Sequence, residues 1–209
     1  MDVLPGQDFF EFAKVLVHSR QHVAPRRLVE PGPSAAQLSD ILAAAAAAPD
    51  HGQLQPWRFV QVPLDKRGCL ADVFGQALQD RDPAATPEQI ENARDKAFRA
   101  PFLMLAIARL TGSTPEQDDK RHLAGELAVG DAERLVSLGC AIENMLLVAN
   151  ALGFGSGLTS GQALASAPLR TLFALQAHEL AVCCINFGTV SKAKSARLRP
   201  DVAAFVTSL

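Results

Sequence analysis

The sequence predicts an α+β fold in which a small central sheet lies between layers of helices. Segments with helical spacing of apolar residues alternate with short apolar runs of strand length. Two of these runs, PFLMLAIAR (101–109) and ELAVCCINFGT (179–189), are almost wholly apolar, which is typical of strands covered on both faces. Because no internal repeat or long linker divides the chain, we expect residues 1–209 to form a single domain.

Helix-capping signals support several of the predicted helices. Ser34 and Gln37 have the spacing of a capping box, and Pro49 stops the alanine-rich helix that they open. Thr86 caps a later helix, with Pro87 in its first turn. The expected helices cover residues 7–20, 34–48, 65–80, 86–99, 126–152 and 166–175.

The longest helical pattern runs from about Glu126 to Leu152 and is apolar over much of its circumference. Its apolar positions are Leu135, Leu138, Ala141, Ile142, Met145, Leu146, Val148 and Ala149. A helix of this kind is central to a fold or lies in a subunit interface.

The remaining segments are a third strand, two loops and a tail. WRFVQV (57–62) is expected to be a strand, and the polar residues 110–122 a surface loop. GFGSGLTSG (153–161) is expected to be a glycine-rich loop. The tail from residue 189 is basic and then apolar.

Composition and charge exclude several classes of function. A net charge of -2 gives no reason to expect nucleic acid or a membrane surface as a partner. No run of eighteen apolar residues is present, and the first residues lack the basic start of a secretory signal, so we expect a cytoplasmic protein. The four cysteines have no CxxC or zinc-ligand spacing, which favours reduced core thiols and no metal site.

Four polar segments interrupt the apolar pattern, each at the end of a predicted element. They are HSRQHVAPRR (18–27), APDHGQLQPW (48–57), GFGSGLTSG (153–161) and GTVSKAKSARLR (188–199). Together, their basic groups, amides and glycines suit an anionic, planar ligand that makes hydrogen bonds. Each segment alone has a plainer interpretation. His51 could be a turn residue, the glycines a helix stop, and the last segment a solvated basic loop.

The order of these segments resembles the FMN-dependent nitroreductase superfamily. APDHGQLQPWRFV, following its helix, is similar to the signature turn of that family, and GCAIENMLLVANALGFGSGLTSG is similar to its central helix and the loop after it. The basic segment near residue 20 and the closing NFGTVSKAKSAR match in position. The resemblance extends from about Phe9 to Val206 and is nearest to the short single-domain branch whose turn reads APDH.

The resemblance implies a three-layer α-β-α fold with a small, mostly antiparallel sheet. It also implies an intertwined homodimer with two FMN sites at the interface, and a C-terminal tail (189–209) that reaches over the partner subunit. The candidate cofactor-binding residues carried over are Arg20, Gln21, His22, Arg26, Arg27, His51, Gln53, Gln55, Leu158, Thr159, Ser160, Lys192, Lys194 and Arg197. Whether Arg20, Arg26 or Arg27 meets the phosphate stays open, because this opening segment is less compact than the family motif.

The activity implied is transfer of a hydride from NAD(P)H, through N5 of FMN, to a small oxidised acceptor of the nitroaromatic or quinone type. Such an enzyme works by alternating half-reactions, and no side chain is expected to act as the catalytic acid or base. Two alternatives of other classes stay open. One is a flavin-binding redox sensor or carrier without rapid turnover, and the other is an all-helical interaction protein without a cofactor.

Overall fold

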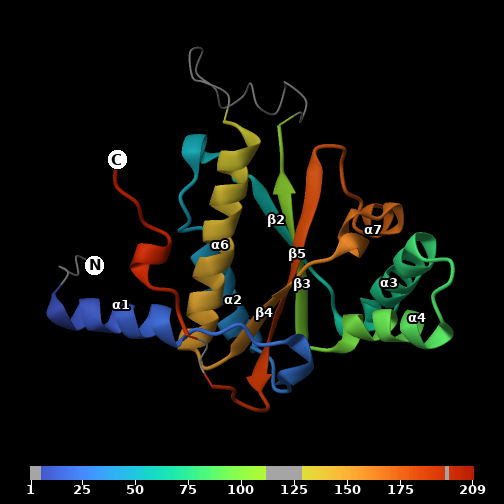
Figure 1. Cartoon of the computed structure of the whole chain (residues 1–209), viewed down its shortest axis with the longest axis horizontal. Helices are drawn as coiled ribbons and strands as arrows, with labels where there is room; N and C mark the ends of the chain where they lie inside the picture. The colour runs from blue at the N-terminus through green and yellow to red at the C-terminus, as the bar shows by residue number, and fades with distance from the viewer. Residues whose placement is uncertain (1–5, 112–128, 196–197) are drawn as a thin grey trace.

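The computed structural model describes residues 6–111, 129–195 and 198–209. A five-stranded sheet lies between helices on both of its faces (Figure 1), so the predicted α+β class is confirmed and an all-helical protein is excluded. The helices are α1 (Gln7–Ser19), α2 (Ala35–Ala45), α3 (Arg67–Arg81), α4 (Pro87–Arg94), α6 (Asp131–Ala151) and α7 (Ala167–Leu172). The strands are β1 (Leu28–Val29), β2 (Trp57–Gln61), β3 (Phe102–Arg109), β4 (Gly155–Thr159) and β5 (Glu179–Val190).

The sheet is built around β5. Its order is β1-β5-β3-β2, with β4 also paired to β5, and the pairs between these strands are antiparallel. The predicted small, mostly antiparallel sheet is therefore confirmed. Because β5 is long, it pairs with β3 along one side while β4 and β1 follow one another along the other.

Strand β3 shows why the two apolar runs are buried on both faces. Met104 and Ala106 pack into the cluster that contains α2 and α6. Leu103 and Leu105 point the other way, into the cluster that contains α3 and α7. Alternate side chains of one strand thus contribute to two cores, which requires an apolar residue at every position.

The predicted capping box at Ser34 is present, and the predicted cap Thr86 belongs to a second one. The Ser34 hydroxyl accepts a hydrogen bond from the Gln37 amide at 3.3 Å, and the Gln37 side chain accepts one from the Ser34 amide at 3.0 Å. Thr86 and Gln89 make the same exchange at the start of α4. Helix α2 ends at Ala45, a few residues before Pro49, because a turn precedes the proline.

The long helix α6 differs from the sequence prediction in one position of its apolar stripe. It begins at Asp131, and Glu126 lies outside the described residues. Leu138 and Met145 are buried as expected, but Leu135 is 38% exposed. Leu135 lies in the second turn of α6, where the buried positions of this chain are Arg134 and Ser137.

The expected glycine-rich loop is wrong in part, because residues 155–159 form strand β4. Gly155 and Gly157 lie where side chains would collide with neighbouring segments. A Cβ at Gly155 would be 2.5 Å from the side chain of Val190, and one at Gly157 would be 2.1 Å from the carbonyl oxygen of Val23. These glycines allow the segment 20–27 to cross close over the strand.

The four cysteines are free, and two of them are buried. Cys183 and Cys184 are buried in β5, where burial raises their pKa values to about 11 and about 12. Cys140 is partly buried and packs against the α2–α6 core, while Cys69 is exposed, so the prediction of core thiols is wrong for Cys69. Among the described residues, no cluster of three metal-ligating side chains is present, and none of the helices is long and apolar enough to span a membrane.

Candidate functional site

A basic cavity of about 540 Å³ lies where the segment after α1 meets the end of α6. We call it the basic cavity. Its basic lining residues are Arg20, His22, Arg27, Lys194 and Arg199, and none of its lining residues is acidic. It therefore gathers positive charge from both ends of the chain, as a site for an anion requires.

Hydrogen bonds to backbone carbonyl groups connect the segments that form the walls of the basic cavity. Val23 donates its amide hydrogen to Ser156 of β4 at 2.8 Å, which attaches the basic segment to the sheet. Arg199 donates to the Arg20 carbonyl at 2.7 Å, and Arg27 donates to the carbonyl of Lys192. The Arg20 side chain also pairs with Glu143 of α6 at 2.8 Å. The N-terminal and C-terminal basic segments are thus tied together.

A second cavity, of about 500 Å³, opens between α3, α4 and the end of β4. We call it the β4 cavity. Thr159 and Ser160 form part of its wall, and its apolar lining includes Phe74, Leu78 and Leu164. Three cationic side chains, Arg81, Lys96 and Arg99, also line it. An apolar interior with cations and hydroxyls on its walls suits a planar ligand that carries hydrogen-bond acceptors.

The basic cavity and the β4 cavity meet at the segment 20–27, where Ala24 lines the first cavity and its neighbour Pro25 lines the second. Strand β4 also contributes to both, through Ser156 to the basic cavity and, three residues later, through Thr159 to the β4 cavity. A ligand with an anionic end and a planar end could therefore use both cavities.

His51, Gln53 and Gln55 lie elsewhere. His51 is exposed and lies 3.6 Å from Glu133, near the start of α6. Gln53 and Gln55 line a third cavity of about 550 Å³ beside Trp57 and Arg58. Asn150, by contrast, lines the basic cavity at the opposite end of α6. Asn150 follows Glu133 by seventeen positions along the helix, a distance of about 25 Å.

The structure therefore divides the predicted site residues into groups. Arg20, Gln21, His22, Arg27 and Lys194 line the basic cavity, Thr159 and Ser160 line the β4 cavity, and Gln53 and Gln55 line the third. Leu158 packs against the α2–α6 core, and Arg26 is exposed. Lys192 meets Arg27 through its backbone carbonyl. Arg197 lies outside the described residues.

Sequence reasoning missed the cations of the β4 cavity and Arg199 of the basic cavity. Lys96 and Arg99 follow α4, where basic residues are typical of a helix C-terminus, so nothing distinguished them as site residues. The only available signal was the position of this basic pair just before the buried strand β3.

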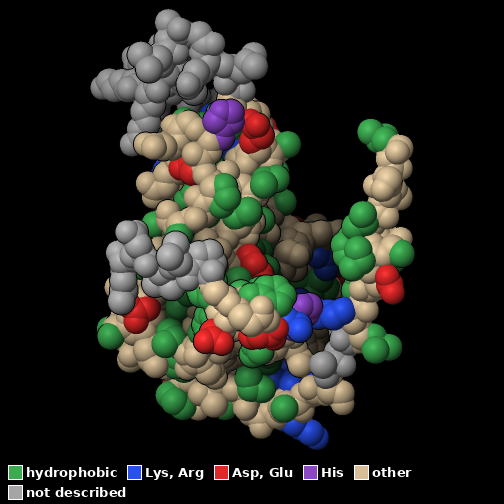
Figure 2. Space-filling model, turned by 90° about the vertical axis from the view of Figure 1, so that its left-hand side faces the viewer, with side chains coloured by type: hydrophobic (Ala, Val, Ile, Leu, Met, Phe, Trp, Pro, Cys, Tyr) green, Lys and Arg blue, Asp and Glu red, His purple; other side chains and the backbone are tan. Residues whose placement is uncertain are grey.

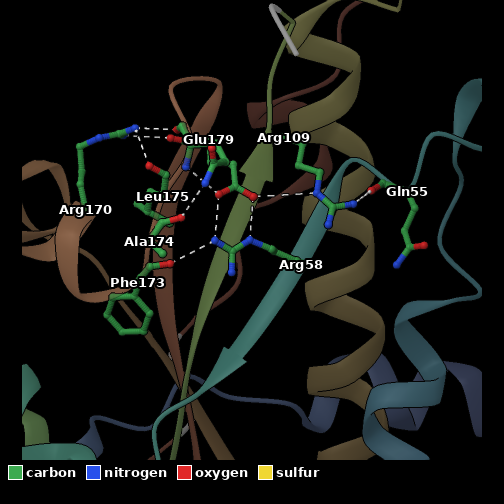
Figure 3. A network of polar contacts seen from close by, with 9 residues as sticks. Gln55, Arg58, Arg109, Arg170, Phe173, Ala174, Leu175 and Glu179 are labelled. Atoms are coloured by element: carbon green, nitrogen blue, oxygen red, sulfur yellow. Dashed lines mark hydrogen bonds and ion pairs between the residues drawn. The ribbon is translucent and has the colours of Figure 1, made fainter. Parts of the chain in front are cut away.

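A network of two arginines and one glutamate joins strands β2, β3 and β5 near the third cavity (Figure 3). Arg58 donates to both oxygens of Glu179, at 2.6 and 2.8 Å, and Arg109 approaches the same carboxylate at 3.9 Å. Arg109 also donates to the Gln55 carbonyl at 3.4 Å. The hydrogen bond from Arg58 lowers the pKa of Glu179 and raises that of Arg58. This network links the first residue of β5 to the turn that carries Gln55.

Two groups of apolar side chains are left exposed to solvent by the described residues of the chain. Helix α1 buries none of its residues, and Phe9, Phe10 and Phe12 are each more than half exposed. Phe205 and Val206 near the C-terminus are also more than half exposed. Figure 2 views the molecule from the α1 side and shows the C-terminal segment standing away from the body.

Comparisons with known proteins agree with this fold. A protein with the name "Putative NAD(P)H nitroreductase YdjA", from Escherichia coli (strain K12), is 33% identical over 184 residues, which are 87% of this chain and 91% of that protein. The solved nitroreductase-like family protein from Bacillus cereus has a TM-score of 0.75 at 16% identity, covering 100% of this chain and 98% of the other. The NADPH:FMN oxidoreductase from Vibrio harveyi, complexed with NAD+, has a TM-score of 0.67 at 14% identity, covering 92% and 75%.

The family match extends over most of the chain. The model of the nitroreductase family matches residues 20–189, from the first arginine of the basic cavity to the end of β5. The chain therefore belongs to the nitroreductase family of oxidoreductases.

Proposed function

We propose that this protein is an FMN-dependent oxidoreductase that passes electrons from NAD(P)H to a small oxidised acceptor of the nitroaromatic or quinone type. The basic cavity carries the proposal, because it offers Arg20, Arg27 and Arg199 to a phosphate without an acidic residue in its lining. Arginine binds phosphate oxygens through paired N–H donors, which makes these residues suitable for the phosphate of FMN.

The adjoining β4 cavity fits the planar part of the same cofactor. Gly157 keeps the segment 20–27 close to β4, and Thr159 and Ser160 present polar groups to the cavity. Lys96 and Arg99 would add positive charge to the wall of the cavity that holds the ring, and so would favour the reduced, anionic form of the cofactor. The donor set thus suits an anionic tail and a ring edge rich in acceptors.

Bound FMN would supply the hydride chemistry, accepting two electrons from NAD(P)H and then giving them to the acceptor in a second half-reaction. The residues of this chain would hold and orient the reactants. Arg27 and Arg199 would fix the phosphate, and the apolar wall of Phe74 and Leu78 would exclude water from one side of the ring. The cationic side chains would oppose the charge that develops on reduction.

A homodimer is part of the proposal. His51 and Gln55 lie near one end of α6, and the basic cavity lies at the other, so one chain does not bring them to its own cavity. A second copy would bring the turn 51–55 to it. The exposed apolar faces of α1 and of the C-terminal segment offer the surface that such an assembly needs.

The test is the visible spectrum of the purified protein, with and without added FMN, followed by NADH or NADPH in the absence of oxygen. We expect flavin bands that bleach within seconds with at least one nucleotide. Bound flavin that either nucleotide bleaches only over hours would favour the redox sensor or carrier. Failure to bind FMN at all would overturn the proposal.

A further inference from the structure

Asn186 of β5 is a buried polar side chain whose hydrogen bonds lead to the β4 cavity. It is 1% exposed, and its Nδ2 atom lies 3.1 Å from the Gly157 carbonyl oxygen, 3.3 Å from Thr159 Oγ1 and 3.4 Å from the Cys184 carbonyl oxygen. Burying an amide in a sheet core costs free energy unless its polar atoms make hydrogen bonds. The three contacts therefore hold the Asn186 side chain in one orientation.

The register of the strands explains how the contact arises. Asn186 pairs with Gly157 and Cys184 pairs with Thr159, so these positions share one face of the sheet. Because residue 157 has no side chain, the Asn186 amide can extend along β4 to the Thr159 hydroxyl. Cys184 and Thr159 both line the β4 cavity, which lies on this face.

The two carbonyl oxygens determine which way the amide points. A carbonyl oxygen can only accept, so the group that faces Gly157 and Cys184 must be the NH₂ of Asn186. Thr159 Oγ1 lies on the same side and therefore accepts from that group. The single hydroxyl proton of Thr159 is then directed away from Asn186. Since Thr159 is exposed and lines the β4 cavity, that proton is available to a ligand there.

We propose that the Thr159 hydroxyl is a hydrogen-bond donor to an acceptor atom on the edge of a planar ring in the β4 cavity, and that Asn186 is the positioning residue that directs this donor. The inference rests on the proposed function, because it requires a ring in this cavity. The acceptor is a ring nitrogen or ring carbonyl oxygen, which both a flavin and an oxidised quinone-type substrate carry.

The first test compares Thr159→Val with Thr159→Ser. Valine has the shape of threonine without the hydroxyl, while serine keeps the donor. If the partner is the flavin, Thr159→Val weakens FMN binding by about fivefold and shifts the absorption maxima of bound FMN, and Thr159→Ser restores both. If the partner is the acceptor, the spectrum stays unchanged and KM for a quinone rises by a similar factor.

Thr189→Val is the matched control. Thr189 also lies in the sheet, but its hydroxyl donates to the Pro31 carbonyl at 2.8 Å and does not line the β4 cavity. We expect this variant to keep the wild-type FMN affinity, spectrum and KM. A wild-type protein that binds FMN while Thr159→Val matches it in all three measurements would overturn the inference and leave the proposed function intact. A wild-type protein that does not bind FMN would overturn both.

The second test separates positioning from structural support. Asn186→Leu is expected to change the FMN spectrum or the KM in the same direction as Thr159→Val. In the Thr159→Val background, Asn186→Leu should add no further change to that readout, although it lowers the thermal stability in both backgrounds. Equal, additive effects in the two backgrounds would show that Asn186 does not act through Thr159. If Asn186→Leu does not fold, the valine and serine variants still decide whether the hydroxyl is a donor.

Discussion

Gly157 of β4 lies directly against the carbonyl group of Val23, so close that a Cβ atom on Gly157 would be 2.1 Å from the carbonyl oxygen. The clash is with backbone, and side-chain rotation cannot relieve it. The segment that brings Arg20, His22 and Arg27 to the basic cavity therefore keeps its place only over a glycine.

The first prediction follows from this contact. Gly157→Ala should displace the segment 20–27 from β4 and lower the affinity for FMN by at least about tenfold, because the phosphate-binding arginines move with it. Fluorescence titration with FMN measures the loss. Gly68→Ala is the control, since Gly68 is helical and a Cβ there meets nothing within 4 Å. An unchanged affinity in Gly157→Ala would contradict the proposed site.

The second prediction decides between two neighbouring arginines. Arg27 lines the basic cavity, while Arg26 is exposed and does not. Arg27→Ala should weaken FMN binding by about tenfold or more, because a charge-assisted contact to phosphate is lost. Arg26→Ala should change it by less than about twofold. The opposite ranking would assign the phosphate to Arg26.

The third prediction concerns the pH dependence of stability. Because Arg58 lowers the pKa of Glu179 in the folded protein, this carboxylate stabilises the fold at pH values above its ordinary pKa of 4.5. That contribution is lost as the pH falls through the lowered value. Glu179→Gln should therefore reduce the free energy of unfolding by about 1–3 kcal/mol at pH 7 and by much less at pH 3.

Urea unfolding of both proteins at several pH values measures this difference. Glu11→Gln is a suitable control, because the contacts of Glu11 with Gln7 and Lys14 on α1 are both exposed. A Glu179→Gln effect that stays constant from pH 7 to pH 3 would show that the charge of Glu179 is not the source of the stabilisation.

The fourth prediction concerns a buried arginine that donates to backbone carbonyl groups. Arg67 is 1% exposed and donates to the carbonyl oxygens of Val62, Ala97, Ala100 and Pro101. Arg67→Lys should lower the free energy of unfolding by about 1–3 kcal/mol, because one ammonium group cannot reach all four acceptors. Arg26→Lys, at an exposed position, should change it by less than about 0.5 kcal/mol. Equal midpoints in chemical denaturation for the two variants would contradict this account.

The fifth prediction tests the assembly. Phe10→Asp and Phe12→Asp, on the exposed face of α1, should shift the protein from dimer to monomer in sedimentation experiments, because a charge in an apolar interface is poorly solvated. Leu64→Asp is the control, since Leu64 is 76% exposed on a different part of the surface. Dimerisation that survives both α1 substitutions would place the interface elsewhere.

The sequence predicts the core of the fold well because periodicity reports burial directly. The runs around Leu105 and Ile185 are apolar at every position, and both strands are covered on two faces. The prediction of a loop at residues 153–161 was wrong in part for a physical reason. Glycine is rare inside strands, and the close approach of Val23 that requires Gly157 comes from a segment more than 130 residues away.

The site was predictable only where its residues belong to a continuous motif. Arg20, His22 and Arg27 stand in one basic segment and do line one cavity. Lys96 and Arg99 have no such marker, because a cation after a helix is ordinary, and only the fold places the segment after α4 and the end of β4 on the walls of one cavity. The distance between His51 and the basic cavity is set by the length of α6, and a short stretch of sequence around His51 does not predict it.

The buried thiols of β5 allow the separation of this central strand from its neighbours to be measured by chemical labelling. With pKa values near 11 and 12, Cys183 and Cys184 exist as thiolates in roughly one molecule per thousand or fewer at pH 8, and both side chains are buried. Exposed Cys69 reacts at once with a maleimide and serves as an internal reference. Slow incorporation of label at Cys183 and Cys184, counted apart from partly buried Cys140, then reports how often the native sheet releases its middle strand, without any denaturant.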